Sequence, residues 1–415
     1  MEPSAKTTLI DHLYAESQKG VIILKISQVD IFQLGEHSTG GATWAGNSII
    51  VKLTTSDGEI GFGEAVPTLR VQPVIQSLRE VARIYQGKNP LDVEANLHEW
   101  HKHDFYMPVS FESTTAASAF DIACWDIIGK HYGAPIRDLL GGTFREKVRL
   151  YANGWYDGCV TPEQFGERAA KWAKMGYTGL KFDVFGPYYD YIDEAGLELA
   201  YQRVKAVSDA TDGKVALMIE HHGRFNPNSA IMIARKLSSL EPLFMEEPIH
   251  PDNLEGYKKY RESTDVRVAL GERLLTIEQV VYVLKNNLTD FLQADITNIG
   301  GVTVAKKVCA IAQAFGVEMA FHNAFGPIQN AATLQLDASI PNFLIQESFW
   351  DAFPAWKRNL VKSQTPVESG FSTVPTKPGI GVEIDEGIIQ KYIASGQEYF
   401  NPDEPVWVVK DTWKN

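Results

Sequence analysis

The sequence predicts an α/β protein in which a TIM-type barrel follows a smaller α+β capping domain. The chain has 415 residues, more than the roughly 250 of a typical TIM barrel. From about Val148 onward, short apolar stretches alternate with gaps of helix length, the pattern of parallel strands joined by helical crossovers. Eight such stretches occur, the number that closes a TIM barrel.

Residues 1–147 are expected to form the capping domain. The stretch SIIVKLTTSDGEIGFGEA (48–65) has the pattern of two strands joined by a turn at Asp57-Gly58. Residues 112–133 follow with apolar side chains at helical spacing, which predicts a buried helix. These apolar positions are Ala116, Ala119, Phe120, Ala123, Ile127 and Ile128.

Residues 148–370 are assigned to the barrel, and several of its predicted strands end in a polar residue. Active sites of such barrels lie at these strand ends. The predicted strands are VRLYANGW (148–155), GLKFDVFG (179–186), VALMIEHHG (215–223), LFMEEP (243–248), VRVALGER (266–273), FLQADI (291–296), VEMAFHN (317–323) and FLIQES (343–348). Residues 371–415, rich in proline, glycine and aromatic residues, are expected to pack back on the capping domain.

The composition narrows the class of protein. The formal net charge of −13 argues against a nucleic acid or a membrane surface as partner. The cysteines, Cys124, Cys159 and Cys309, have no disulfide or zinc spacing. The first residues lack the continuous apolar stretch of a signal peptide, and no apolar run approaches the roughly 20 residues of a membrane span. We therefore expect a cytoplasmic protein.

Three glutamates mark the ends of consecutive predicted strands. Glu220, Glu246 and Glu272 follow one another at equal intervals of 26 residues, which is one strand–helix unit each. A single glutamate at a strand end is more often a surface group. Three in register would repel one another unless a cation lies among them. All-oxygen ligands favour magnesium, so we predict that these residues bind Mg2+.

Successive side chains of a strand point to opposite faces, so neighbouring polar residues can be assigned to different faces. Glu247 should point to the face opposite that of Glu246. By the same rule, His222 shares a face with Glu220, and His221 faces away. His222 is therefore the candidate for catalysis, and His221 the candidate for a packing role.

The other strand-end groups complete a polar ring. Lys181 and Asp183 share one face of the second strand, so both can reach the barrel mouth. A lysine there would more often extend to solvent, but its polar neighbours favour a place in the site. Asp295 and His322 end the sixth and seventh strands, and an Asp beside a His favours a general base. Glu347 ends the eighth strand.

These motifs resemble those of the enolase superfamily, specifically its mandelate-racemase-like group. The resemblance covers nearly the whole chain. It is carried by SAFDIACWDIIGK (118–130), LLGG (139–142), Glu220, EEP (246–248), GER (271–273), DITNIGG (295–301) and His322. It implies a modified (β/α)7β barrel with an α+β capping domain.

The resemblance also implies roles for the site residues. The three strand-end glutamates would hold magnesium, Asp295 and His322 would form the base dyad, and Glu347 would hydrogen-bond the enolate oxygen. Removal of a proton next to a carboxylate leaves a doubly charged enediolate. Magnesium and preplaced donors stabilise that charge where it develops.

Two departures from the group bear on the reaction. Glu220 stands where the first metal ligand is commonly an aspartate. Racemases carry Lys-x-Lys on the second strand, and here the motif is Lys181-Phe182-Asp183. Lys181 matches the lysine that neutralises the substrate carboxylate, whereas Asp183 stands where the second base would be. Racemisation needs a base on each face of the carbon, and only His322 is a clear one.

Dehydration needs one base and one acid, and a second motif supplies the acid. EHHGR (220–224) is similar to the Asp-x-His-Gly-Arg of acid-sugar dehydratases, in which the histidine is the acid. His222 would take this role, and Arg224, Asp183 and Lys181 would bind the substrate. The resemblance thus implies a magnesium-dependent lyase of the gluconate, galactonate and arabinonate dehydratase type. It would remove the C2 proton and C3 hydroxyl of an aldonate, giving a 2-keto-3-deoxy acid.

Several alternatives stay open at this point. The protein could be an epimerase or lactone cycloisomerase of the same ancestry, or a noncatalytic barrel that serves as a scaffold. The base could be His322 or Lys181. The sugar is not identified, and its selection is expected to involve the loop GEHSTGGATWAG (35–46). We also expect a homo-oligomer, namely a dimer, tetramer or octamer.

Overall fold

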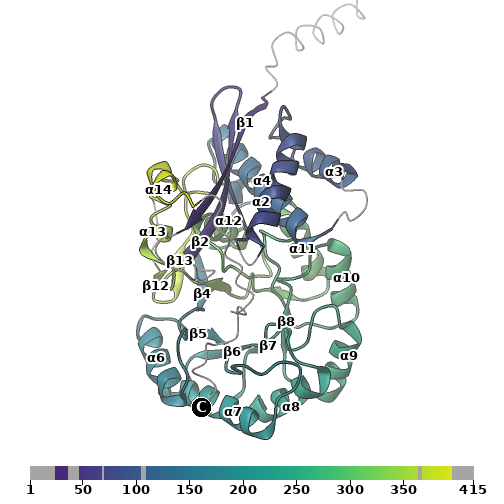
Figure 1. Cartoon of the computed structure of the whole chain (residues 1–415), viewed down its shortest axis with the longest axis vertical. Helices are drawn as coiled ribbons and strands as arrows, with labels where there is room; N and C mark the ends of the chain where they lie inside the picture. The colour runs from purple at the N-terminus through teal and green to yellow at the C-terminus, as the bar shows by residue number, and fades with distance from the viewer. Residues whose placement is uncertain (1–23, 36–45, 68–69, 104–108, 363–366, 395–415) are drawn as a thin grey trace, which may run out of the picture.

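A computed structural model of the chain describes residues 24–35, 46–67, 70–103, 109–362 and 367–394 (Figure 1). Figure 1 shows the capping domain at one end of the molecule and the barrel at the other. The first residues, used for the signal-peptide expectation, and residues 36–45 of the predicted specificity loop lie outside the described residues. Among the described residues, no helix combines the length and the apolar character that crossing a bilayer requires.

The capping domain contains a three-stranded antiparallel sheet with helices packed on it. The sheet order is β1-β2-β3, and the predicted turn at Asp57-Gly58 joins β2 to β3. Gly58 has φ of +93°, a conformation that favours glycine. The elements are β1 (Ile26–Gly35), β2 (Asn47–Thr55), β3 (Ile60–Ala65), α2 (Val71–Tyr85), α3 (Val93–His103), α4 (Phe111–His131) and α5 (Ile136–Leu139).

Helix α4 is the buried helix predicted over residues 112–133. It contacts β2, β3 and α2 on the capping side and the barrel helix α11 on the other. Because both sides are covered, apolar and small residues occur all around the helix, as expected for a helix without a solvent face. Helix α4 therefore joins the two domains.

Within residues 147–348, eight strands and seven intervening helices form the barrel, which confirms the predicted (β/α)7β fold. Neighbouring strands pair in parallel from β4 to β10, and the last strand, β11, pairs with the first. A parallel bridge between Met319 and Phe343 joins β10 to the residues before β11 and closes the barrel. In chain order the elements are β4 (Lys147–Ala152), α6 (Pro162–Lys174), β5 (Gly179–Phe182), α7 (Glu194–Ala210), β6 (Ala216–Glu220), α8 (Pro227–Leu237), β7 (Phe244–Glu246), α9 (Leu254–Ser263), β8 (Val268–Leu270), α10 (Ile277–Lys285), β9 (Phe291–Leu292), α11 (Gly301–Ala314), β10 (Glu318–Met319), α12 (Pro327–Ala338) and β11 (Gln346–Ser348).

Seven of the eight barrel strands end earlier than the sequence pattern predicted, and only the last, β11, ends at the predicted residue. Glu272, Asp295 and His322 lie in the loops after β8, β9 and β10 and not in the strands themselves. At Gly271 the backbone leaves the strand conformation with φ of +152°. The polar groups at the barrel mouth are therefore carried by short loops directly above the sheet.

An apolar layer fills the barrel below these polar groups, and we call it the barrel floor. Its members face inward, and most stand two positions before a polar residue of the mouth, as expected from alternation along a strand. They are Tyr151, Met218, Phe244, Ala269, Phe291, Ala320 and Ile345. The polar groups of the mouth therefore lie directly above a layer of buried, mainly apolar side chains.

The capping domain is joined to the start of α11 by a buried carboxylate. Asp121 on α4 accepts the Thr303 N–H at 3.1 Å and also the Thr303 hydroxyl. Ser118 accepts the Gly300 N–H at 2.9 Å. Gly301 has φ of +77°, and a Cβ there would lie 2.1 Å from an Asp121 oxygen, so this approach requires glycine.

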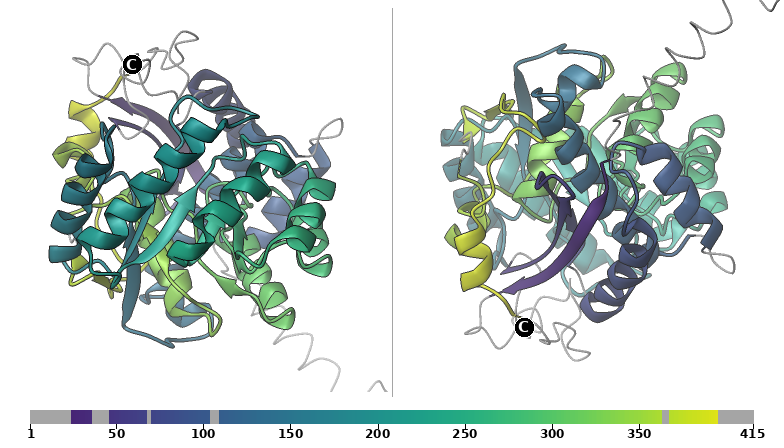
Figure 2. Two further views of the ribbon diagram at one scale, coloured as in Figure 1. Left: turned by 90° about the horizontal axis from the view of Figure 1, so that it is seen from below. Right: turned by 90° about the horizontal axis from the view of Figure 1, so that it is seen from above.

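The C-terminal part of the chain contacts both domains. Strand β13 pairs antiparallel with β4 of the barrel, and the N–H of Ala394 donates to Gln33 of the capping sheet at 2.9 Å. Figure 2 shows α14 beside the capping sheet. The elements are α13 (Ala355–Arg358), β12 (Val367–Glu368), β13 (Phe371–Thr373) and α14 (Glu386–Lys391). The domain limits at residues 147 and 370 stay predictions.

We expect Asp121→Ala to lower the free energy of unfolding. The change leaves the buried N–H and hydroxyl of Thr303 without their acceptor, and each unpaired buried donor costs about 1–3 kcal/mol. Urea unfolding measures the difference. The control is Asp138→Ala, whose side chain is 50% exposed and should change stability by less than about 0.5 kcal/mol. Equal effects of the two variants would contradict the role of Asp121.

Candidate active site

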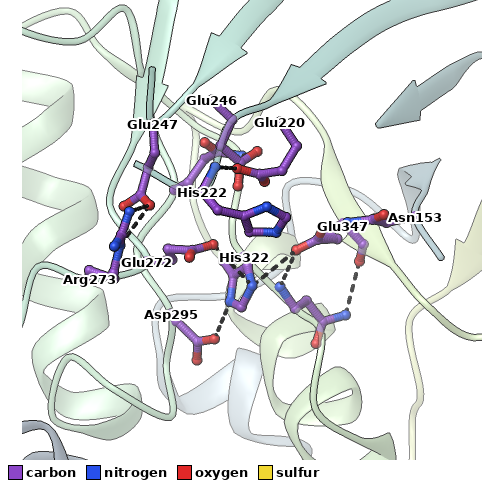
Figure 3. Close-up of polar contacts among 12 residues, drawn as sticks. Asn153, Glu220, His222, Glu246, Glu247, Glu272, Arg273, Asp295, His322 and Glu347 are labelled. Atoms are coloured by element: carbon purple, nitrogen blue, oxygen red, sulfur yellow. Dashed lines mark hydrogen bonds and ion pairs between the residues drawn. The ribbon is translucent and has the colours of Figure 1, made fainter. Parts of the chain in front are cut away.

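Three carboxylates meet at the carboxyl ends of β6, β7 and β8 (Figure 3). Oxygen atoms of Glu220, Glu246 and Glu272 all lie within 4.8 Å of one another. Glu220 and Glu246 are register partners on neighbouring strands and are buried, whereas Glu272 is partly exposed. The equal spacing in the sequence does bring the three side chains together, and their role as metal ligands stays a prediction.

Burial and neighbouring charges shift the pKa values of two of these carboxylates in opposite directions. Burial and the charge of Glu220 raise the pKa of Glu246 well above its usual range. Burial also acts to raise the pKa of Glu220, but His222 and Lys181 lower it below its usual value. A cation among the oxygens would offset the repulsion, and hard oxygen donors are the usual ligands of small divalent cations. The donor set therefore fits a divalent metal ion.

Glu247 lies outside the cluster, next to a cation of its own. Its carboxylate accepts Arg273 Nε at 2.7 Å and also pairs with Nη2 of the same guanidinium. The backbone at Glu247 has φ of +38°, which turns this side chain away from Glu246. The two adjacent glutamates therefore have separate partners, although both are buried.

Lys181 is the cation at the centre of the site. Its Nζ lies 2.6 Å from Glu246, 2.8 Å from Glu347 and 3.1 Å from Glu220, and the side chain is 1% exposed. Burial disfavours the ammonium, but these carboxylates raise the pKa of Lys181 well above its usual range. Lys181 is therefore a fixed positive charge in contact with two members of the carboxylate cluster, Glu220 and Glu246, and with Glu347.

The predicted pair of His322 and Asp295 is present. His322 Nδ1 lies 2.5 Å from Asp295, and Nε2 lies 3.2 Å from Glu272 and 3.7 Å from Glu347 (Figure 3). Burial lowers the pKa of His322, but the surrounding carboxylates raise it to about 10. The Asp295 contact fixes the ring, so that Nε2 faces the carboxylate cluster.

His222 belongs to the same site but has a different support. Its backbone N–H donates to Glu220 at 2.7 Å, and φ of +52° turns the ring toward the mouth. Nδ1 lies 3.1 Å from Asp183, and the side chain is 32% exposed. Glu220 and Asp183 raise the pKa of His222 against the effect of burial. His221, by contrast, is buried, with its Nδ1 3.0 Å from the Ile219 carbonyl oxygen.

Asp183 is held between two cationic groups. Besides His222, it pairs with Arg224 Nη2 at 2.6 Å. The Arg224 side chain is 1% exposed, and its guanidinium lies 5.9 Å from the ring centre of Phe185 and 5.6 Å from that of Phe225. Arg224 thus lies behind Asp183, and Asp183 is the nearer of the two to the site. Their roles in substrate binding stay predictions.

Glu347 completes the ring of polar groups. One carboxylate oxygen accepts Asn153 Nδ2 at 2.7 Å and the Lys181 ammonium, and the other accepts the Asn323 N–H at 3.0 Å. Although burial opposes it, Lys181 and His322 lower the pKa of Glu347 below its usual range. The group is therefore held as a buried carboxylate.

Three amide side chains of the site were missed from the sequence. Gln293 donates to Glu246 at 2.6 Å, Asn153 donates to Glu347, and Gln329 donates to Asp295 at 2.9 Å. Gln293 stands two positions before Asp295, so the rule of alternation could have placed it on the same face. Gln329 comes from helix α12, and no local signal marks it.

Comparison with known families decides where this protein belongs. Residues 164–388 match the family described as Enolase C-terminal domain-like, and residues 32–141 match the family described as Mandelate racemase / muconate lactonizing enzyme, N-terminal domain. The chain belongs to the enolase superfamily. The resemblance seen in the motifs is thereby confirmed for both domains of this superfamily member.

Individual relatives of this enolase-superfamily chain are dehydratases. It is 45% identical over 389 residues to a D-gluconate dehydratase of Thermoproteus tenax, covering 94% of this chain and 78% of that protein. It is also 45% identical over 389 residues to a D-gluconate/D-galactonate dehydratase of Picrophilus torridus, covering 94% and 99%. A crystal structure of an enolase-superfamily member from Salmonella Typhimurium matches with a TM-score of 0.83 at 30% identity, covering 89% and 98%. The expectation that the chain is an enzyme is confirmed.

We expect Glu246→Gln to weaken the binding of a divalent cation at least about tenfold. Mutation of a residue that only hydrogen-bonds to a metal ligand already lowers metal affinity typically 10–100-fold, and Glu246 would be a ligand itself. The fold should persist, since Gln resembles the protonated carboxyl that the raised pKa of Glu246 favours in the metal-free protein. Titration calorimetry with Mg2+ measures the affinity.

The matched control is Glu247→Gln, which changes the neighbouring buried carboxylate on the Arg273 side. Its cation affinity should stay close to that of the unchanged protein. Unchanged affinity in Glu246→Gln would remove Glu246 from the ligand set.

Proposed function

We propose that this enolase-superfamily protein dehydrates a sugar acid in a magnesium-dependent reaction. D-gluconate and D-galactonate are the first candidates, because relatives at 45% identity are named for these acids. The observation that carries the proposal is the presence of two differently supported histidines, His322 and His222, beside one carboxylate cluster. Such a pair supplies one base and one acid.

Glu220, Glu246 and Glu272 would hold the magnesium ion. When bound, Mg2+ would stabilise the negative charge of the enediolate on the substrate carboxylate. Lys181 and Glu347 would complete this environment, with Lys181 as a positive charge and Glu347 as the partner of an enolate oxygen. The identity of the metal and these roles belong to the proposal.

In the proposed reaction the neutral form of His322 removes the proton from C2 through Nε2. A cation held by Glu272 would favour this form, because it offsets a carboxylate charge that raises the pKa of His322. The electrons of that C–H bond first pass to the substrate carboxylate, which becomes the enediolate, and then return to form the C2–C3 double bond as the C3–O bond breaks. His222 donates a proton to the departing hydroxyl, which leaves as water. The resulting enol loses the proton of its C2 hydroxyl and takes up a proton at C3, which gives the 2-keto-3-deoxy acid, so the net change is the loss of one water.

Geometry favours His322 over Lys181 as the base. The Lys181 ammonium is directed at three carboxylates, which occupy its three donors. His322 uses Nδ1 for Asp295 and turns Nε2 toward the cluster where the substrate carboxylate would lie. Asp183 would orient His222 and accept a substrate hydroxyl, and Arg224 would support Asp183.

With Mg2+ present, the purified protein should convert D-gluconate or D-galactonate into a product that reacts with semicarbazide, because a 2-keto-3-deoxy acid carries a ketone. Chelation of the metal should stop the reaction. Product without a carbonyl group, but with altered stereochemistry or a lactone, would support the epimerase or cycloisomerase. No turnover on four-, five- or six-carbon acids would support a noncatalytic scaffold.

The two histidine variants should fail at different steps. Each His→Asn change should lower dehydration about 10²–10⁴-fold, the usual contribution of a positioned acid or base. In deuterium oxide, His222→Asn should still exchange the C2 proton of the substrate, whereas His322→Asn should not. Proton NMR of the substrate measures this exchange.

His250→Asn is the control, because its ring is 55% exposed and lies outside the polar ring of the mouth. It should dehydrate and exchange like the unchanged protein. Exchange that persists in His322→Asn would transfer the role of base to Lys181. The homo-oligomer expected from the sequence stays a prediction.

A further inference from the structure

The pair of His322 and Asp295 has a third member, which comes from helix α12. Gln329 Nε2 donates to both oxygens of the Asp295 carboxylate, at 2.9 Å each. The oxygen of the same amide accepts the Phe325 N–H at 2.8 Å. Both ends of this fully buried amide are therefore engaged, which fixes its orientation.

The first turn of α12 receives its cap from the other domain. The residue that precedes the helix is Gly326, which has no side chain to act as a cap. Glu64 on β3 takes this place, because one of its oxygens accepts the N–H of Ile328 at 3.1 Å and of Gln329 at 3.0 Å. The first N–H groups of a helix lack partners within the helix, and its dipole is positive there, so a carboxylate suits this position.

The local structure is arranged around this carboxylate. A Cβ at Gly326 would lie 1.9 Å from a Glu64 oxygen, so the contact requires glycine at that position. The Ser48 hydroxyl donates to Glu64, and the buried Lys357 supplies a positive charge nearby. Glu64 itself is completely buried. Burial of a charge is costly unless partners compensate it. Here the Ser48 hydroxyl, the charge of Lys357 and the first N–H groups of α12 compensate the Glu64 carboxylate.

We infer that Glu64 of the capping domain is a positioning residue for the proton-abstracting pair, acting through Gln329. The contacts run without a gap from Glu64 to the N–H of Gln329, from its amide to Asp295, and from Asp295 to His322. The inference rests on the proposed function, because it takes His322 as the group that removes the C2 proton.

The size of the expected effect follows from how strictly a base must be placed. A misplacement of the reacting groups by about 1 Å, caused by a mutation far from the chemistry, can cost about 10²-fold in rate. Loss of the Glu64 carboxylate frees the first turn of α12 and with it the backbone of Gln329. Asp295 would then lose its fixed amide partner, and His322 would lose its fixed orientation toward C2.

The kinetic experiment uses the full-length magnesium-loaded protein with D-gluconate or D-galactonate, whichever it turns over, and with the same acid deuterated at C2. Glu64→Ala should lower kcat about 10–100-fold with KM within about twofold, and the primary deuterium isotope effect on kcat should rise. A purely structural loss would lower the amount of active protein and leave the isotope effect unchanged. Glu64→Gln keeps an oxygen acceptor at the helix start, so it should recover most of the rate.

Asp126→Asn is the matched control for a buried capping-domain carboxylate. Asp126 accepts the N–H groups of Phe62 and Ile380 at 3.0 Å each, on β3 and on the C-terminal segment. This variant should reduce stability without raising the isotope effect. Gln329→Leu, which removes the donor to Asp295, should raise it and provides a second test if Glu64→Ala does not fold.

A measurement without substrate separates this inference from the proposed function. In deuterated, 15N-histidine-labelled protein, the low-field Nδ1 proton of His322 is assigned by its disappearance in His322→Asn. Its resonance should shift or broaden in Glu64→Ala or Gln329→Leu and stay in place in Asp126→Asn. An inactive wild type would defeat the proposed function, and this resonance would still decide the role of Glu64. An unmoved resonance, or an isotope effect equal to that of Asp126→Asn, would overturn the inference.

Discussion

The mouth of the barrel depends on one ammonium group enclosed by carboxylates. Lys181 contacts Glu220, Glu246 and Glu347, which come from three strands. Such groups can be buried side by side only if positive charge lies among them or one of them holds a proton, because an uncompensated buried charge is strongly destabilising. The ammonium also lies 5.8 Å from the ring centre of Tyr151 in the barrel floor. The apolar barrel floor on one side lowers the local dielectric constant and so strengthens these ion pairs, and the other polar groups are arranged around them.

The two histidines differ in what holds them, and this difference fits the base and acid roles that we propose for them. His322 is nearly buried and is fixed by Asp295, itself held by Gln329. His222 stands on a left-handed backbone position at the rim, with Asp183 as its partner. The base must be aligned with the C2–H bond when it removes the proton. The acid must stay within hydrogen-bond distance of the C3 oxygen while that oxygen departs. A rigid ring and a more exposed ring suit these two tasks.

The fold and the convergence of the site could be predicted because both follow from short-range periodicity. The interval of 26 residues between Glu220 and Glu246, repeated between Glu246 and Glu272, predicts matching strand ends, and Glu220 and Glu246 are in register on neighbouring parallel strands. Alternation also places Gln293 on the face of Asp295, two positions further along the chain. Gln329 and Glu64 lie outside its reach, because their contacts join a helix start to another domain and depend on tertiary packing. Residues 36–45 lie outside the described structure.

The barrel helices α11 and α12 both begin against an acidic residue of the capping domain, Asp121 and Glu64 respectively. At each junction a glycine, Gly301 or Gly326, makes room for the carboxylate. The two halves of the chain are therefore not interchangeable modules. A chimera that joined this barrel to a capping domain from another member would need acceptors at the same two helix starts. The capping loops are not part of these two contacts, so changes in the loops leave the junction of the two domains intact.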